Sequence, residues 1–137
     1  MAEDVVRSSG PAQWAAVVLA LEGMALTVFV LIEVFALAAD QAASSMTAVA
    51  LIVLTLIGAA ALFAFAAGTY RGRVWARSGG VVLQVLALAL ALAALTVQPV
   101  PWAFALGVGI PGLLGLVLLI TASRRDGPQQ PEREIDA

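Results

Sequence analysis

The chain has 137 residues, of which 62% are hydrophobic and only 12% are charged. Soluble globular domains contain about 45–50% apolar and about 25% charged residues, so this composition excludes an ordinary soluble domain. Cysteine and histidine are both absent from the sequence. Their absence excludes disulfide bonds, thiolate and imidazole metal ligands, and Ser-His-Asp catalysis. The length predicts one compact bundle without a separate catalytic domain.

Four long apolar segments follow one another along the chain. A polar stretch over residues 1–13 predicts a flexible cytoplasmic tail, and a proline-broken stretch over 123–137 predicts a disordered one. Each apolar segment exceeds the roughly 20 residues that cross the hydrocarbon core of a bilayer. The predicted fold is therefore all-α, a transmembrane four-helix bundle over residues 14–122. Its spans are predicted over residues 14–38, 46–70, 74–97 and 102–122.

Two of the apolar segments have an alternative interpretation. Ala36-Leu37-Ala38 resembles a signal-peptide cleavage site. However, the apolar run before it is far longer than the about 7–15 residues of a signal h-region, and it contains two acids. The alternating Ala and Leu of residues 87–93 is typical of a strand in water. An open strand inside a bilayer would leave backbone groups unpaired, so a helix is predicted for this segment. The first segment is likewise predicted to be a transmembrane helix, because of its length and its two acids.

The basic residues predict the orientation in the membrane. They fall before the first span, between the second and third, and after the fourth, whereas the opposite connections contain no Arg or Lys. Basic loops stay in the cytoplasm, so both termini are predicted to lie on the cytoplasmic side of the plasma (cell inner) membrane. Trp14, Tyr70 and Trp75 would then lie at the inner interface, and Trp102 at the outer one. The arginines are Arg7, Arg71, Arg73, Arg77, Arg124, Arg125 and Arg133.

The first span contains two carboxyl groups, Glu22 and Glu33. Eleven residues at 100° each place Glu33 within about 20° of Glu22, and Asp40 falls near the same stripe. Acids inside a span usually face protein or water, which favours a proton or cation relay or a cation site in a small exporter. The structural alternative is a neutral buried acid bonded to a neighbouring helix, with Glu33 reaching interfacial water. We favour the structural interpretation for both residues.

Gln84 is the polar group most deeply placed in the third span. Glu22 lies eight residues past Trp14, and Gln84 lies nine past Trp75. At 1.5 Å per residue, both lie about 12–14 Å along their helices. Lipid cannot satisfy either group, so we predict a hydrogen bond between Gln84 and a protonated Glu22. Together with Glu33, these residues form the candidate intramembrane polar site.

A proline, the arginines of the central loop and several small residues indicate how the helices pack and which surface contacts they make. Pro111 predicts a kink in the fourth span. Arg71, Arg73 and Arg77 are candidates for contact with anionic lipid headgroups or an acidic partner surface, although fixing the topology is the favoured role. Small residues allow helix backbones to approach closely, either within the bundle or between copies. They are Gly58, Ala60, Ala64 and Gly68 in the second span, and Gly107, Gly112 and Gly115 in the fourth.

The loop between the second and third spans carries a resemblance to a known group of proteins. Its sequence Arg71-Gly72-Arg73-Val74-Trp75-Ala76-Arg77, followed by Val81-Val82-Leu83-Gln84, resembles small four-span integral membrane proteins common in actinobacteria. Gly79 stands where that group's pattern would place a proline. The resemblance implies the four-span layout but no activity.

A second resemblance concerns the first span. Glu22 followed by Gly23 and Thr27 is similar in outline to small multidrug transporters, which are four-span chains with a glutamate in the first helix. The chain departs from that pattern because it has no lysine and a strongly basic central loop. This resemblance implies proton-coupled export.

The function favoured by the sequence is that of a non-enzymatic accessory or interaction subunit in the membrane. Its expected partners are the lipid bilayer, anionic lipids, and an unknown membrane protein or a second copy of the chain, and no nucleic acid. The alternative is a small proton-coupled cation or drug exporter that uses Glu22. A membrane enzyme is the least favoured class, and no catalytic, cofactor-binding or metal-binding residue is predicted.

Overall fold

The computed structural model describes residues 10–125, which form four α-helices. Their 29, 26, 21 and 24 residues correspond to lengths of about 44, 39, 32 and 36 Å, against about 30 Å for a hydrocarbon core. All four are long and apolar enough to cross a membrane. The predicted all-α four-helix architecture is confirmed, and the Ala–Leu segment is helical. The helices are α1 (Gly10–Ala38), α2 (Ser45–Tyr70), α3 (Val74–Ala94) and α4 (Trp102–Arg125).

Helix α2 begins one residue before its predicted start, and three other helix boundaries differ from the predicted ones by three or four residues. Helix α1 begins at Gly10 rather than Trp14, since Pro11 is well suited to a first helical turn, where its missing N–H costs nothing. Helix α3 ends at Ala94 instead of residue 97. Helix α4 continues to Arg125, and arginines are favourable at the negative end of a helix dipole. The remainder of the two predicted tails, residues 1–9 and 126–137, lies outside the described residues.

Two helices end in the same kind of turn. After α2, Gly72 adopts φ 72°, and the N–H of Arg73 bonds to the carbonyl of Gly68. After α1, Asp40 adopts φ 55°, and the N–H of Gln41 bonds to the carbonyl of Ala36. These are Schellman turns, which require a left-handed residue just beyond the helix. Asp40 therefore lies in a turn and not on the helical stripe of Glu22 and Glu33.

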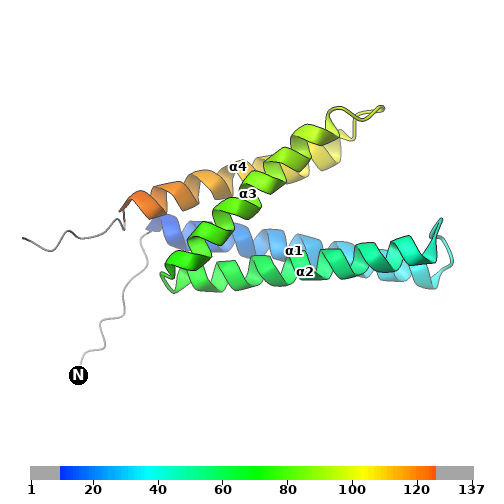
Figure 1. Cartoon of the computed structure of the whole chain (residues 1–137), viewed down its shortest axis with the longest axis horizontal. Coiled ribbons are helices and arrows are strands. Elements are labelled where there is room, and N and C mark those ends of the chain that lie inside the picture. The colour runs from blue at the N-terminus through cyan, green and yellow to red at the C-terminus, as the bar shows by residue number, and fades with distance from the viewer. Residues whose placement is uncertain (1–9, 126–137) are drawn as a thin grey trace, which may run out of the picture.

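The helices form two antiparallel hairpins, α1–α2 and α3–α4, which are shown in Figure 1. The hairpins converge at one end of the molecule and separate toward the other. The converging end contains the α2–α3 connection and every arginine of residues 10–125, and we call it the arginine end. The other end contains the α1–α2 and α3–α4 connections, and we call it the divergent end.

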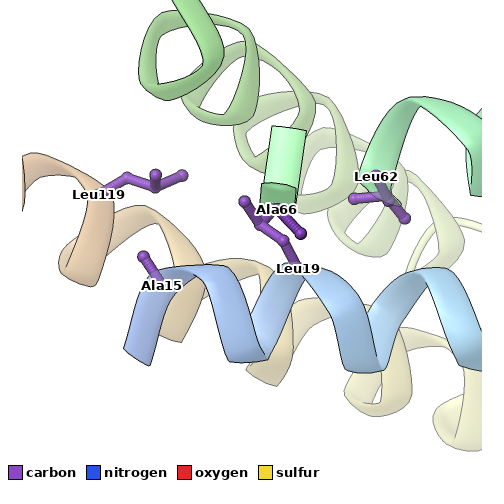
Figure 2. Close-up of a cluster of buried hydrophobic side chains, with 5 residues drawn as sticks. All are labelled: Ala15, Leu19, Leu62, Ala66 and Leu119. Atoms are coloured by element: carbon purple, nitrogen blue, oxygen red, sulfur yellow. The ribbon is translucent and has the colours of Figure 1, made fainter. Parts of the chain in front are cut away.

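The hydrophobic core lies in the half of the molecule next to the arginine end. Figure 2 shows Leu19 of α1 directed toward Ala66 of α2, with side chains of α1, α2 and α4 around them. No residue of α2 before Ala59 is buried, and α1 has one buried residue beyond Gly23, namely Val30. The four helices thus pack as one bundle over this half only. The core cluster consists of Ala15, Leu19, Leu62, Ala66 and Leu119.

Glycines explain how closely the helices approach near the arginine end. A Cβ on Gly68 of α2 would collide with the Cβ of Ala76 on α3. A Cβ on Gly80 of α3 would lie 3.0 Å from Leu119 Cδ1. The predicted close packing of Gly68, Gly112 and Gly115 is confirmed, because all three are buried within the chain. Three other residues of the predicted set face outward instead: Ala60, Ala64 and Gly107.

Candidate functional site

The structure brings Glu22 and Gln84 together. The amide Nε2 of Gln84 donates a hydrogen bond of 2.7 Å to Oε2 of Glu22. Gln84 is 1% exposed, whereas Glu22 is half-buried. The predicted bond between these two residues is confirmed. It joins α1 to α3, the pair of helices that lie diagonally across the bundle, since α1 packs mainly against α2 and α4.

Two glycines of α4 form the other wall of this site. A Cβ on Gly115 would lie 2.5 Å from Nε2 and 2.8 Å from Cδ of Gln84, and a Cβ on Gly112 would lie 3.5 Å from its Oε1. The Gln84 side chain therefore lies between the glycine face of α4 and the carboxyl group of Glu22. Three helices meet at this one amide.

One atom of the site is buried without a partner. Oε1 of Gln84 accepts no hydrogen bond from any of residues 10–125. The hydroxyls nearest in sequence to the site on α1 and α4 donate to their own helices: Thr27 to the carbonyl of Gly23, and Thr121 to that of Val117. Gln84 Oε1 is therefore an acceptor in an apolar junction that lacks a donor.

Glu33 is separate from this pair. It lies eleven residues beyond Glu22 on α1, which corresponds to about 16 Å along the helix axis. The residue is half-buried, and its Oε2 is covered without a hydrogen-bond partner among the described residues. The predicted three-residue polar site is therefore a pair plus an isolated carboxyl in the divergent half.

The structure also divides the three arginines of the central loop. Arg71 and Arg73 are exposed, but Arg77 is 7% exposed. Arg77 shares the buried face of α3 with Gly80 and Gln84, at spacings of three and seven residues. The surface predicted to contact lipid or a partner is thereby reduced to Arg71 and Arg73.

The four aromatic residues predicted to lie at membrane interfaces are found near the two ends of the bundle. Trp14, Tyr70 and Trp75 are all more than half exposed near the arginine end, and Trp102 is similarly exposed at the divergent end. The ring of Trp75 contacts that of Phe65 edge-on, with centroids 5.8 Å apart. Amphipathic rings at both ends of a bundle are typical of membrane–water interfaces.

Nothing in residues 10–125 gathers three His, Cys, Asp or Glu side chains that could hold a metal ion. A depression beside Ser45, Met46 and Val49 lies at the start of α2, far along the chain from Glu22 and Gln84. It is open and mainly apolar, so it offers no set of groups that would orient a ligand.

The sequence does not predict two features of the structure, one at this site and one at the end of α2. Gly112 and Gly115 were read as general packing residues, although they form the wall against which Gln84 lies. Their spacing of three residues on one helix face was the available signal. Thr69 was not singled out, yet it is fully buried and its hydroxyl has no partner among the described residues. Its position at the end of an apolar run gave no signal of this.

Comparison with known proteins found no match for this chain. No protein-family model, curated protein or solved structure matches it. The two resemblances described from the sequence therefore stay predictions, and the function has to be argued from the fold and the site.

Proposed function

We propose that the chain is a non-enzymatic integral membrane protein that acts as an interaction subunit. The occupant we propose is a transmembrane helix of a partner membrane protein, placed against the hairpin faces of the divergent half. The observation that carries this proposal is that the four helices pack together over one half only. In the other half, each hairpin has a face that the rest of the described chain does not cover.

The isolated carboxyl of Glu33 supports the proposal that a partner helix lies against this surface. Glu22 is directed toward α3, and Glu33 lies within about 20° of Glu22 around the helix. It thus belongs to the face of α1 that turns toward the second hairpin, and it lies beyond Val30, the last buried residue of α1. Its covered Oε2 has no donor among the described residues. A partner helix with an amide, hydroxyl or basic side chain at this depth would supply one.

The test uses a photoreactive amino acid at Phe29, with Leu31 as the matched control. Both side chains are exposed, at 57% and 53%. Phe29 lies about 20° from Glu22 around α1, whereas Leu31 lies about 180° away. We expect irradiation of native membranes to give one discrete cross-linked membrane protein from position 29 and lipid adducts alone from position 31. The yield should fall in the Glu33→Leu background. Equal products from both positions would contradict the proposed surface, and a product of twice the chain mass would assign the occupant to a second copy.

A second candidate function is proton-coupled export of a cation or drug. The favouring observation is that Glu22, although bonded to Gln84, stays half-buried within a span-length apolar helix. Protein reconstituted in vesicles with an imposed proton gradient would show cation efflux that is lost in Glu22→Gln. No efflux above that of empty vesicles would eliminate this candidate.

For the location, we propose the plasma membrane with both termini in the cytoplasm. The support is that the described arginines gather at one end of the molecule. There the exposed Arg71 and Arg73 would contact anionic headgroups, at about 1 kcal/mol per residue. Replacing both with glutamine should reduce the retention of phosphatidylglycerol relative to phosphatidylcholine in native mass spectrometry. The buried Arg77 is left unchanged.

A further inference from the structure

We propose that Glu22 and Gln84 form a proton-dependent clasp between the two hairpins. In the closed clasp, Glu22 is a neutral acid that donates its proton to Gln84 Oε1 and accepts from Gln84 Nε2. In the open clasp, Glu22 has lost that proton, and the α3–α4 hairpin is released from α1. This inference does not rest on the proposed function, because it concerns one junction inside the chain and holds with or without a partner.

The first argument is the buried acceptor. Gln84 is 1% exposed, its Nε2 is bonded to Glu22, and its Oε1 has no donor among the described residues. The hydroxyls of Thr27 and Thr121 donate to carbonyls of their own helices. Buried polar atoms are nearly always hydrogen-bonded. The carboxyl that already touches this amide is the donor at hand, and it can donate only when it is protonated.

The second argument is the fixed position of the amide. The two glycines of α4, Gly112 and Gly115, leave room for Gln84 and nothing more, since a Cβ on Gly115 would lie 2.5 Å from Nε2. Gln84 is therefore held against α4, within its own hairpin. Glu22 belongs to the other hairpin. A bond between the two side chains is consequently a bond between hairpins.

The third argument concerns the charges near Glu22. On α1 the next acid is Glu33, three turns toward the divergent end. Helix α2 contains no Asp, Glu, Arg or Lys. On α3 the nearest charged residue is Arg77, seven residues before Gln84, and on α4 the charged residues are Arg124 and Arg125 at its end. An ionised Glu22 would thus have one amide N–H and no adjacent counter-charge, so ionisation disfavours the closed junction.

The test combines two measurements on the reconstituted full chain. Infrared spectroscopy detects the carbonyl stretch of a protonated carboxyl group, and we expect a band that titrates with pH and is absent in Glu22→Gln. Because the chain has no cysteine, single spin labels can be attached through A43C and V97C, at exposed positions in the two connections of the divergent end. The distance between them should shift over the same pH range as the infrared band.

Three variants test whether the distance shift depends on the Glu22–Gln84 bond. Glu22→Gln keeps a donor and an acceptor at every pH, so it should lose the pH-dependent shift and retain the distance of the acidic form. Gln84→Leu should also lose the shift, because it removes the partner. Glu33→Gln is the matched control in the same helix and should keep the wild-type response. The clasp is overturned if the infrared difference between wild type and Glu22→Gln contains no titrating carboxyl band, or if the distance shift is equal in wild type and Glu22→Gln.

Discussion

The two halves of the molecule are built from the same helices but are held together differently. In the arginine half, four helices meet around small residues, and glycines bring their backbones close together. In the divergent half, each helix packs mainly against its hairpin neighbour. In water the exposed faces of the divergent half would be driven together. In a bilayer, lipid is as apolar as leucine, so packing and polar contacts decide whether helices associate.

The comparison shows that glycines and one polar pair, rather than hydrophobicity, determine how far along the molecule the four helices pack together. Hydrophobic residues are abundant in both halves. What differs is that Gly68, Gly80 and Gly115 lie in the arginine half or at its border, next to residues of another helix. The hydrogen bond between Glu22 and Gln84 joins the two hairpins at this border. The predictions below therefore act on the two ends, on these glycines, and on that pair.

The largest expected effect is an all-or-none difference in the labelling of the two ends by an impermeant reagent. A cysteine introduced at Ala43, in the divergent end, should react with an impermeant thiol reagent added to intact cells. One introduced at Ser123, near the arginine end, should react only after the cells are permeabilised. Both positions are exposed, and the chain has no cysteine of its own to confuse the result. The reverse pattern would place the arginine end outside, against the positive-inside rule.

The second effect contrasts the same substitution near the arginine end of α2 and at the middle of that helix. In Gly68→Ala the new methyl would collide with the Cβ of Ala76, which belongs to a helix and cannot rotate away. We expect a loss of about 1–3 kcal/mol in the free energy of unfolding. Gly58→Ala would meet only the terminal Cδ1 of Leu26, at 3.3 Å. This control should cost less than about 1 kcal/mol, because alanine is also the better helix former. Equal losses in detergent unfolding titrations would show that α2 is packed as tightly at its middle as near the arginine end.

The third effect uses matched substitutions in α4. In Gly115→Ala the methyl would displace Gln84, which is buried and bonded to Glu22 and therefore cannot move without losing that bond. A loss of about 1–2 kcal/mol is expected in the same unfolding titration. Gly107→Ala meets nothing within 4 Å. It should be neutral or stabilising by up to about 1 kcal/mol. A neutral Gly115→Ala would mean that Gln84 does not depend on the glycine wall.

Much of this architecture could be predicted from the sequence. Runs of apolar residues interrupted by Arg71-Gly72-Arg73 and by the prolines near Pro99 determine the four helices, since few other folds satisfy the backbone inside a bilayer. The Glu22–Gln84 bond was predictable because helical rise converts sequence position into depth, and few polar groups lie at that depth. Both inferences use only distances along a helix.

What the sequence could not provide was the orientation of one helix relative to another. The burial of Arg77 and the separation of the hairpins depend on which faces meet, and apolar residues surround every helix here. The outward-facing Ala60 and the buried Gly68 lie in the same small-residue stretch of α2. No periodicity distinguishes them when both lipid and protein neighbours are apolar.

The smallest expected effect is the energy of the pair itself, and a double-mutant cycle measures it. Glu22→Leu, Gln84→Leu and the double variant would be unfolded in detergent beside the wild type. Hydrogen bonds between membrane helices average about 0.6 kcal/mol, with a maximum near 1.7, because the unfolded chain in a membrane also finds partners. Burial of Gln84 and the short 2.7 Å distance favour the upper part of that range. We therefore expect a stabilising coupling of about 0.5–1.5 kcal/mol.

The control is the same cycle with Glu33 in place of Glu22, since Glu33 lies about three turns from Gln84 and should be additive within about 0.3 kcal/mol. If the Glu22 cycle is equally additive, the bond contributes nothing to holding the hairpins together. The position of α3 across the bundle from α1 would then depend on apolar packing, such as that of Gly80 against Leu19 and Leu119. If only the Glu22 cycle shows coupling, the pair marks the border between the two halves energetically as well as geometrically. Repeating the cycle at alkaline pH then measures how much of the Glu22–Gln84 coupling energy depends on the proton of Glu22. That coupling energy should fall at alkaline pH, while the coupling energy of the Glu33 control stays at zero.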